Sequence, residues 1–193
     1  MKALPKILLA LTAVAALSFA HPAKAINLIT NPGFETGDFT GWTQSGNTAN
    51  TFVVGTLSIA PHSGNFQAAL GNVTTGFLSQ MLALAVGTTY TVDFWLANNV
   101  PGINSFAASL GGVTGFSVTN AGASGYAEHT FNFTYTGGST QLLFTFLNAP
   151  GSWFLDDVSV TPTGVGVPDG GTTVMLLGMA FGALGLARRF LKS

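Results

Sequence analysis

Few side chains between residues 26 and 166 could do acid–base, nucleophilic or metal chemistry. This stretch has no cysteine, its histidines are His62 and His129, and its acids are Glu35, Asp38, Asp93, Glu128, Asp156 and Asp157. It has no Gly-x-Ser-x-Gly nucleophile motif, phosphate-binding loop or His-Glu-x-x-His zinc motif. A glycoside hydrolase built from distant carboxylates, such as Asp93 with Glu128, is the enzymatic alternative that spacing leaves open. The sequence therefore favours a protein that is not an enzyme.

Three aromatic side chains are candidates for stacking on sugar rings. The flat faces of tryptophan and tyrosine can bury the apolar C–H surface of a pyranose. Trp95, Tyr126 and Trp153 stand in or beside strand-like segments, and Trp95 is predicted to face outward from its sheet. The alternative for each is a place in the core or at an edge. Trp42, which follows the Gly-Asp-Phe-Thr-Gly segment, is assigned to the core.

The charges are divided unevenly along the chain. All six lysines and arginines lie in the end segments, at positions 2, 6, 24, 188, 189 and 192, so residues 26–166 carry six acids and no base. This stretch has a formal charge of about −6, although the whole chain has −1. It therefore has no electrostatic means of gripping nucleic acid. Without cysteine it also has no disulfides, and a hydrophobic core must stabilise it.

The elements that must position these side chains read as β-strands. The segments TYTVDFWLA (89–97), HTFNFTY (129–135), QLLFTFLN (141–148) and WFLDDVSV (153–160) alternate apolar and other residues. Such alternation is typical of half-buried strands. Segments rich in Gly, Asn and Pro, such as NNVPG and NAPG, separate them and predict turns. We therefore predict an all-β, antiparallel β-sandwich over residues 26–161.

The N-terminal segment has the features of a secretory signal peptide. Lys2 and Lys6 precede an apolar run from Ile7 to Ala20, and Ala23 and Ala25 form a small-x-small cleavage site. This layout predicts that signal peptidase removes residues 1–25 and leaves Ile26 as the new N-terminus. An uncleaved N-terminal anchor is the alternative.

The C-terminal segment has the features of a membrane-spanning helix with a basic end. Residues 162–166 read as a linker, and residues 172–187 are apolar or small, enough for a helix of roughly 24 Å. Arg188 and Arg189 open the basic end, 188–193, and hold it in the cytoplasm. The alternative is a buried core helix. The two ends together predict an exported protein that its tail anchors in the inner membrane before processing.

The last 27 residues, 167–193, resemble the PEP-CTERM class of exosortase sorting signals, in its Val-Pro-Asp-Ser-Gly variant. The motif is Val167, Pro168, Asp169, Gly170 and Gly171, with Gly170 where the variant has serine, followed by the apolar helix and the arginines. The resemblance implies that a membrane-embedded exosortase recognises and removes the tail. It also implies a surface or secreted protein of a Gram-negative bacterium, of a kind that often accompanies exopolysaccharide production.

The stretch before the tail resembles the jelly-roll carbohydrate-binding and galactose-binding-like domains. Four segments carry the likeness in the expected order: NLITNPGFETGDFTGW, HSGNFQAAL, GTTYTVDFWL and WFLDDVSV. The resemblance implies a jelly-roll sandwich in which the first and last segments meet at one rim, often around a structural calcium. Carried over, the candidate ligands are Glu35 and one of Asp156 and Asp157.

Strand parity selects Asp156 from these two aspartates. Asp156 shares parity with Phe154, Val158 and Val160, so it is predicted to face inward. A buried carboxylate needs a partner, and residues 26–166 offer no lysine or arginine. A calcium ion could supply the charge, with Asp157 as the substitute ligand. The alternative is that Asp156 accepts backbone N–H bonds near the strand end and needs no metal.

These observations predict an exported, non-enzymatic surface or extracellular-matrix protein. The alternative is a carbohydrate-binding module whose partner is an extracellular polysaccharide, and a glycoside hydrolase is the third possibility. Nucleic acid is excluded as a partner.

Overall fold

The computed structural model describes residues 26–163, which belong to one compact unit. The predicted signal peptide and sorting tail lie outside the described residues. The described part consists of strands, turns and loops, and holds no helix that could cross a membrane. The strands are β1 (Thr43–Gly46), β2 (Thr51–Val54), β3 (Gln67–Leu70), β4 (Gly76–Met81), β5 (Thr89–Asn98), β6 (Ile103–Leu110), β7 (Val113–Thr119), β8 (Ser124–Thr134), β9 (Gln141–Ala149) and β10 (Trp153–Pro162).

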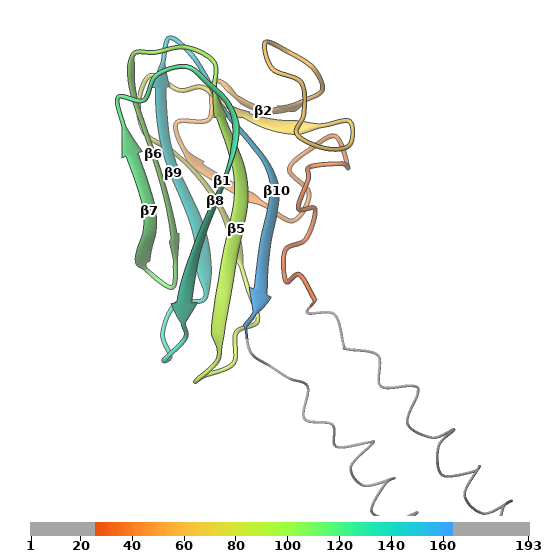
Figure 1. Cartoon of the computed structure of the whole chain (residues 1–193), viewed down its shortest axis with the longest axis vertical. Coiled ribbons are helices and arrows are strands. Elements are labelled where there is room, and N and C mark those ends of the chain that lie inside the picture. Colours follow the sequence, from red (N-terminus) through yellow and green to blue (C-terminus); the bar gives the residue numbers. More distant parts are fainter. Residues whose placement is uncertain (1–25, 164–193) are drawn as a thin grey trace, which may run out of the picture. The chain divides into compact units, whose positions relative to one another are not determined.

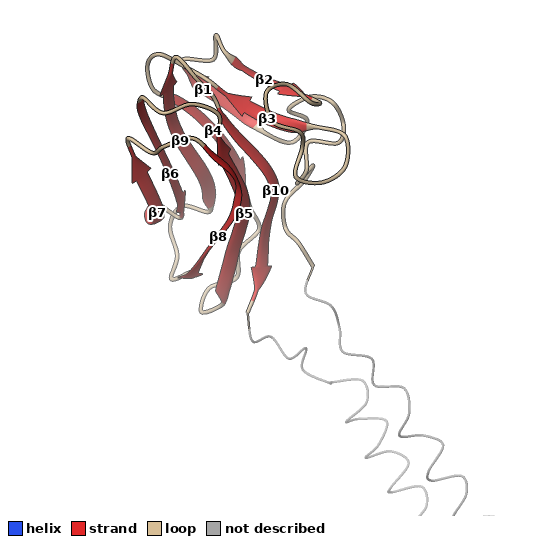
Figure 2. Ribbon diagram, turned by 45° about the horizontal axis from the view of Figure 1, so that its top comes forward, coloured by secondary structure: helices blue, strands red, loops and turns tan. Residues whose placement is uncertain are grey.

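The strands form two five-stranded sheets that pack face to face (Figures 1 and 2). The first sheet has the order β1-β4-β9-β6-β7, and the second has the order β2-β3-β10-β5-β8. Neighbouring strands are antiparallel in both sheets, and chain neighbours such as β4 and β5 lie in different sheets. The prediction of an all-β, antiparallel jelly-roll sandwich is therefore confirmed.

The core lies between the sheets and is largely aromatic. The alternation predicted from sequence appears in β5 and β9, where every second side chain is fully buried. Phe94, Phe106 and Phe144 contact one another at ring-centroid distances of 5.4–5.9 Å. Trp42 is also buried, as predicted, and it stacks on Phe34.

A β-bulge in β10 changes which way its side chains face. Asp156 pairs with Trp95 and Ser159 pairs with Asp93, so two residues of β10 lie opposite Phe94 alone. Asp157, the first of the two, has a φ of 48°. The extra residue reverses the parity of the strand.

The parity prediction is therefore wrong at Asp156. Before the bulge, Phe154 belongs to a small cluster on the outer side of the second sheet, together with Ala69 and Ala97. After the bulge, Val158 and Val160 lie in the core between the sheets. Asp156 is fully buried, but it lies beneath the loop of residues 55–66 on the outer side.

The two ends of the described chain meet at one end of the sandwich. Leu28 N–H donates to the Val160 carbonyl at 2.9 Å, and the Asn27 side chain accepts from Val160 N–H at 3.0 Å. Thr163 N–H donates to the Thr89 carbonyl at the start of β5. The loops after β5 and β9 lie at the opposite end of these strands (Figure 1).

Candidate functional site

A loop, residues 55–66, covers part of the outer face of the second sheet, and Glu35 holds its end. Both carboxylate oxygens of Glu35 accept the Asn65 N–H, at 2.9 and 3.0 Å, and one also accepts the Phe66 N–H at 2.9 Å. The bonds from Phe66 and then Asn65 lower the pKa of Glu35. Gly64, directly before Asn65, has a φ of 61°, and a β-carbon there would collide with the Glu35 carboxylate.

Asp156 holds the same loop from below. Its carboxylate accepts N–H bonds from His62 at 2.9 Å, Ser63 at 3.3 Å and Asp157 at 2.8 Å. Burial, followed by the charge of Asp157, raises the pKa of Asp156 to about 6, against the opposing effect of these hydrogen bonds. Asp156 therefore takes the backbone N–H bonds that the sequence analysis gave as the alternative to a metal.

Asp157 fixes the side chains at the tip of this segment. It contacts Nδ1 of His62 at 2.6 Å and accepts from the Ser63 hydroxyl at 2.7 Å. The His62–Asp157 contact joins residues 95 positions apart in the sequence. The bulge makes it possible, because it turns Asp157 toward the loop.

The two predicted calcium ligands, Glu35 and Asp156, and the substitute Asp157 all have atoms close to Gly33. A β-carbon on Gly33 would lie 3.3 Å from Oδ1 of Asp157, 3.5 Å from Oδ1 of Asp156 and 3.7 Å from Cγ of Glu35. Carboxylate oxygens are ligands that calcium prefers, and the cluster has His62 as its only potential cation among the described residues. The residue types therefore fit calcium, although residues 26–163 show no group of three or more His, Cys, Asp or Glu side chains arranged to hold a metal.

The structure brings two of the three candidate stacking residues together and separates the third. Trp95 is partly exposed on the outer face, as predicted, and the His62 ring lies parallel to it with 3.7 Å between centroids. Tyr126 meets His62 edge-on at 5.5 Å and donates its hydroxyl to the Gln67 side chain. Trp153 is 2% exposed and donates its indole N–H to backbone carbonyls of the first sheet, so it is a core residue.

The two carboxylates considered for hydrolysis are neighbours on the outer face. Glu128 lies close to Asp93, and partial burial followed by the Glu128 charge raises the pKa of Asp93 to about 6. Glycosidases hold their two carboxyl groups roughly 5 Å or more apart with the glycosidic bond between them, whereas Asp93 and Glu128 lie side by side on the paired strands β5 and β8.

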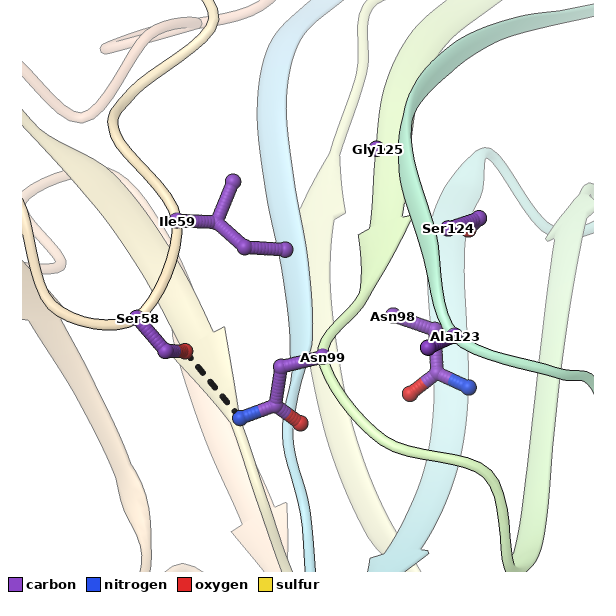
Figure 3. Close-up of a pocket in the computed structure, with 7 residues that line it drawn as sticks. All are labelled: Ser58, Ile59, Asn98, Asn99, Ala123, Ser124 and Gly125. Carbon is purple, nitrogen blue, oxygen red and sulfur yellow. Dashed lines mark hydrogen bonds between the residues drawn. The ribbon is translucent and has the colours of Figure 1, made fainter.

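A shallow pocket of about 350 Å³ opens near this surface (Figure 3). Its residue Asn98 is at the end of β5, and Thr163 contacts Thr89 at the start of the same strand. Ser58 and Ile59 of the loop lie on one side and Ala123, Ser124 and Gly125 lie on the other, with Asn98 and Asn99 between them. The Asn99 side chain donates to the Ser58 hydroxyl at 3.1 Å. The lining is uncharged and combines hydroxyl, amide and apolar groups.

Sequence reasoning missed His62 and the pocket. His62 was noted as one of two histidines, but its contact with Trp95 depends on a loop whose path no periodicity specifies. The pocket residues come from three separate loops and strand ends. The HSGNFQAAL segment, which supported the family resemblance, was the signal that pointed to this loop.

The fold and this surface define a jelly-roll domain of the carbohydrate-binding class. Residues 26–152 match the family model described as carbohydrate binding domain, CBM_4_9, and the chain belongs to this family. Residues 166–190 match the VPDSG-CTERM motif, which confirms the resemblance of the tail. A comparison with curated proteins gives no match.

Several solved structures are similar to the described domain. TmCBM61, solved in complex with β-1,4-galactotriose, is 26% identical, with a TM-score of 0.53 over 72% of this chain and 99% of that chain. The CBM22-1 and GH10 modules of a Clostridium thermocellum xylanase, solved with xylohexaose, match at 17% identity and a TM-score of 0.54, over 75% of this chain and 30% of that chain. A family 16 carbohydrate-binding module matches at 18% identity and a TM-score of 0.52, over 70% of this chain and 99% of that chain. The last two likenesses concern the fold alone.

Proposed function

We propose that this protein is an exported, non-enzymatic surface or extracellular-matrix protein that binds polysaccharide. The observation that carries the proposal is the carbohydrate-binding family match, which spans residues 26–152 of the sandwich. The 26% identity to TmCBM61, a galactotriose complex, supports a glycan as the ligand.

The arrangement of the acids supports binding without hydrolysis. Glu35, Asp156 and Asp157 are engaged in holding the loop 55–66. Asp93 and Glu128 lie side by side on the paired strands β5 and β8, whereas a glycosidase holds its two carboxyl groups on either side of the glycosidic bond. In this proposal the jelly-roll domain contributes affinity for the polysaccharide and no catalysis.

We propose further that the tail delivers the domain to the cell surface. The VPDSG-CTERM match at residues 166–190 supports recognition by an exosortase-type enzyme. In this proposal signal peptidase acts first at Ala25, the tail then anchors the protein in the inner membrane, and processing near residues 167–171 releases it.

A calcium ion is also proposed, with a structural role only. Glu35 and Asp156, with Asp157 as the substitute ligand, would hold it beside Gly33. Calcium would supply positive charge to these carboxylates in a domain without lysine or arginine. The loop 55–66, which these residues already fasten, would gain stability.

A glycan array with residues 26–163 tests the proposed function. This segment is a compact unit with its own core, so it is a suitable fragment. We expect binding to one class of polysaccharide and no release of reducing ends during prolonged incubation. Failure to bind across the array would reject the binding function, and release of reducing ends would show that the domain is a hydrolase.

A further inference from the structure

The pocket of Figure 3 has the size and the lining of a small sugar site. Its volume of about 350 Å³ is at the lower end of the roughly 300–1,000 Å³ typical of ligand sites. Ser58 and Ser124 offer exposed hydroxyls, Asn99 offers an amide, and Ile59 offers apolar surface. Alternating hydroxyl and C–H groups on a pyranose match such a lining.

The walls of the pocket are held in place before any ligand arrives. The Asn98 amide donates to the carbonyls of Ala121 and Gly122, at 3.1 and 3.0 Å, and accepts from the buried Asn148 side chain at 2.8 Å. The Asn99 side chain accepts from Ser152 N–H at 2.8 Å. A fixed wall lowers the entropy that binding would otherwise cost.

The loop side of the pocket is fixed as well. The fully buried Gln67 donates to the carbonyls of Gly55 and Ile59, at 2.9 and 2.6 Å. Ile59 and Tyr126 pack against the same small apolar cluster, which includes Phe154. Ile59 therefore belongs both to the pocket lining and to the cluster that Tyr126 packs against, and Tyr126 in turn contacts His62.

The electrostatics of the domain select among sugars. The pocket lining carries no charge, and residues 26–163 contain six acids and no lysine or arginine. A uronic acid or a sulfated sugar would find no cation to pair with and would be repelled by the net negative charge. A neutral sugar has no such cost.

We propose that this pocket binds a neutral sugar unit of the polysaccharide. The proposal rests on the proposed function and names both the place of binding and the class of ligand. Ser58, Asn99 and Ser124 would form hydrogen bonds with sugar hydroxyls, and Ile59 would contact a C–H face.

Calorimetric titration of residues 26–163 tests this, with β-1,4-galactotriose and xylohexaose as neutral probes and a galacturonic acid trisaccharide as the anionic one. We expect a neutral probe to bind and the anionic probe not to bind. Ala123→Trp, which fills the pocket from an exposed position, should weaken binding at least tenfold. Ser124→Ala should weaken it about twofold to tenfold, as expected for one hydrogen bond.

Ala83→Trp is the matched control, because Ala83 is exposed near the opposite end of the sandwich. It should leave binding unchanged, and circular dichroism should show both tryptophan variants folded. Full binding by folded Ala123→Trp would overturn the pocket while the proposed function stands. Stronger binding of the anionic probe would overturn the neutral-sugar assignment. No binding to these probes, nor to any glycan on the array, would reject the pocket and the proposed function together.

Discussion

The His62 ring lies flat against the Trp95 ring, with 3.7 Å between their centroids and 14° between their planes. The imidazole therefore covers one face of the indole that the sequence offered as a sugar-stacking surface. Asp157 holds His62 in this position through the contact at Nδ1. The availability of Trp95 to a ligand thus depends on a loop residue far away in the sequence.

His62→Ala should uncover Trp95 and loosen the loop. We expect stronger quenching of tryptophan fluorescence by acrylamide and a free energy of unfolding lower by about 1–2 kcal/mol, from the lost ring contact and hydrogen bond. His62→Phe, which keeps the stack but not the Asp157 contact, should restore the low quenching. Equal quenching in the wild type and His62→Ala would show that the imidazole does not shield Trp95.

Calcium should stabilise residues 26–163 through the carboxylates around Gly33. At a calcium concentration 100 times its Kd we expect a gain of about 2.7 kcal/mol, seen as a higher Tm. Asp156→Asn should reduce this gain, whereas Asp38→Asn, outside the cluster, should retain it. An unchanged Tm after chelation, in both the wild type and Asp156→Asn, would reject a structural calcium.

The Asp93–Glu128 pair should make stability fall as the pH rises. The pKa of Asp93 is raised from 3.8 to about 6, so between these values the folded state binds a proton that the unfolded state releases. Its favourable contribution is therefore present at low pH and lost as the pH rises through about 6. Asp93→Asn should raise the Tm by about 2–4 °C at pH 7.5 and change it little at pH 4.5.

Asp38 should make stability change with pH in the opposite direction to Asp93, and Asp38→Asn tests this. Hydrogen bonds from Thr40 and then Thr36 lower the pKa of Asp38, so its contribution is present above about pH 4 and lost in acid. This variant should lower the Tm at pH 7.5.

For the Asp93 prediction, parallel Tm–pH profiles for the wild type and Asp93→Asn would show that Asp93 does not cause the loss of stability as the pH rises.

Trp153 should contribute to stability and not to sugar binding. Trp153→Ala should lower the free energy of unfolding by about 3–5 kcal/mol, because it leaves a large cavity in the core. Trp153→Phe should cost about 1–2 kcal/mol through the two lost hydrogen bonds to Ser105 and Leu147. Urea denaturation measures both changes. A large loss of glycan affinity in folded Trp153→Phe would show that Trp153 takes part in sugar binding.

The sorting motif should be needed for release from the membrane. Replacement of Pro168 and Asp169 by alanine should trap the full-length protein in the inner membrane, whereas replacement of Thr172 and Thr173 should not. Mass spectrometry of the wild-type surface protein should show a loss of roughly the tail. Residues 188–193 still attached to most of the surface protein would indicate a permanent anchor.

The regular strands could be predicted from sequence because their burial follows a period of two. Phe94, Phe144 and Phe146 are fully buried, as the alternation required. The same rule failed in β10, because the bulge at Asp157 inserts one extra residue and so reverses which side chains face the core after it. The positive φ of Asp157 leaves no trace in the hydrophobic pattern of the sequence. The position of Asp156 on the outer side of the sheet, under the loop 55–66, could therefore not be predicted.

The candidate site was predictable in kind but not in arrangement. The family resemblance brought Glu35 near Asp156 and Asp157, and the structure places all three around Gly33. The contacts they make depend on the N–H groups of residues 62–66, which lie in an irregular loop. The ring types of Trp95 and Tyr126 predict sugar stacking, but the His62 ring that covers Trp95 belongs to that same loop.

The close approach of Leu28 to Val160 gives the domain two poles. The first and last residues of the described domain lie at the same end of the sandwich, where Thr163 contacts Thr89. β5 then runs ten residues to Asn98, so the pocket lies roughly 30 Å away at the other pole. A second domain could therefore be joined at either end of residues 26–163 without a covalent attachment beside the pocket.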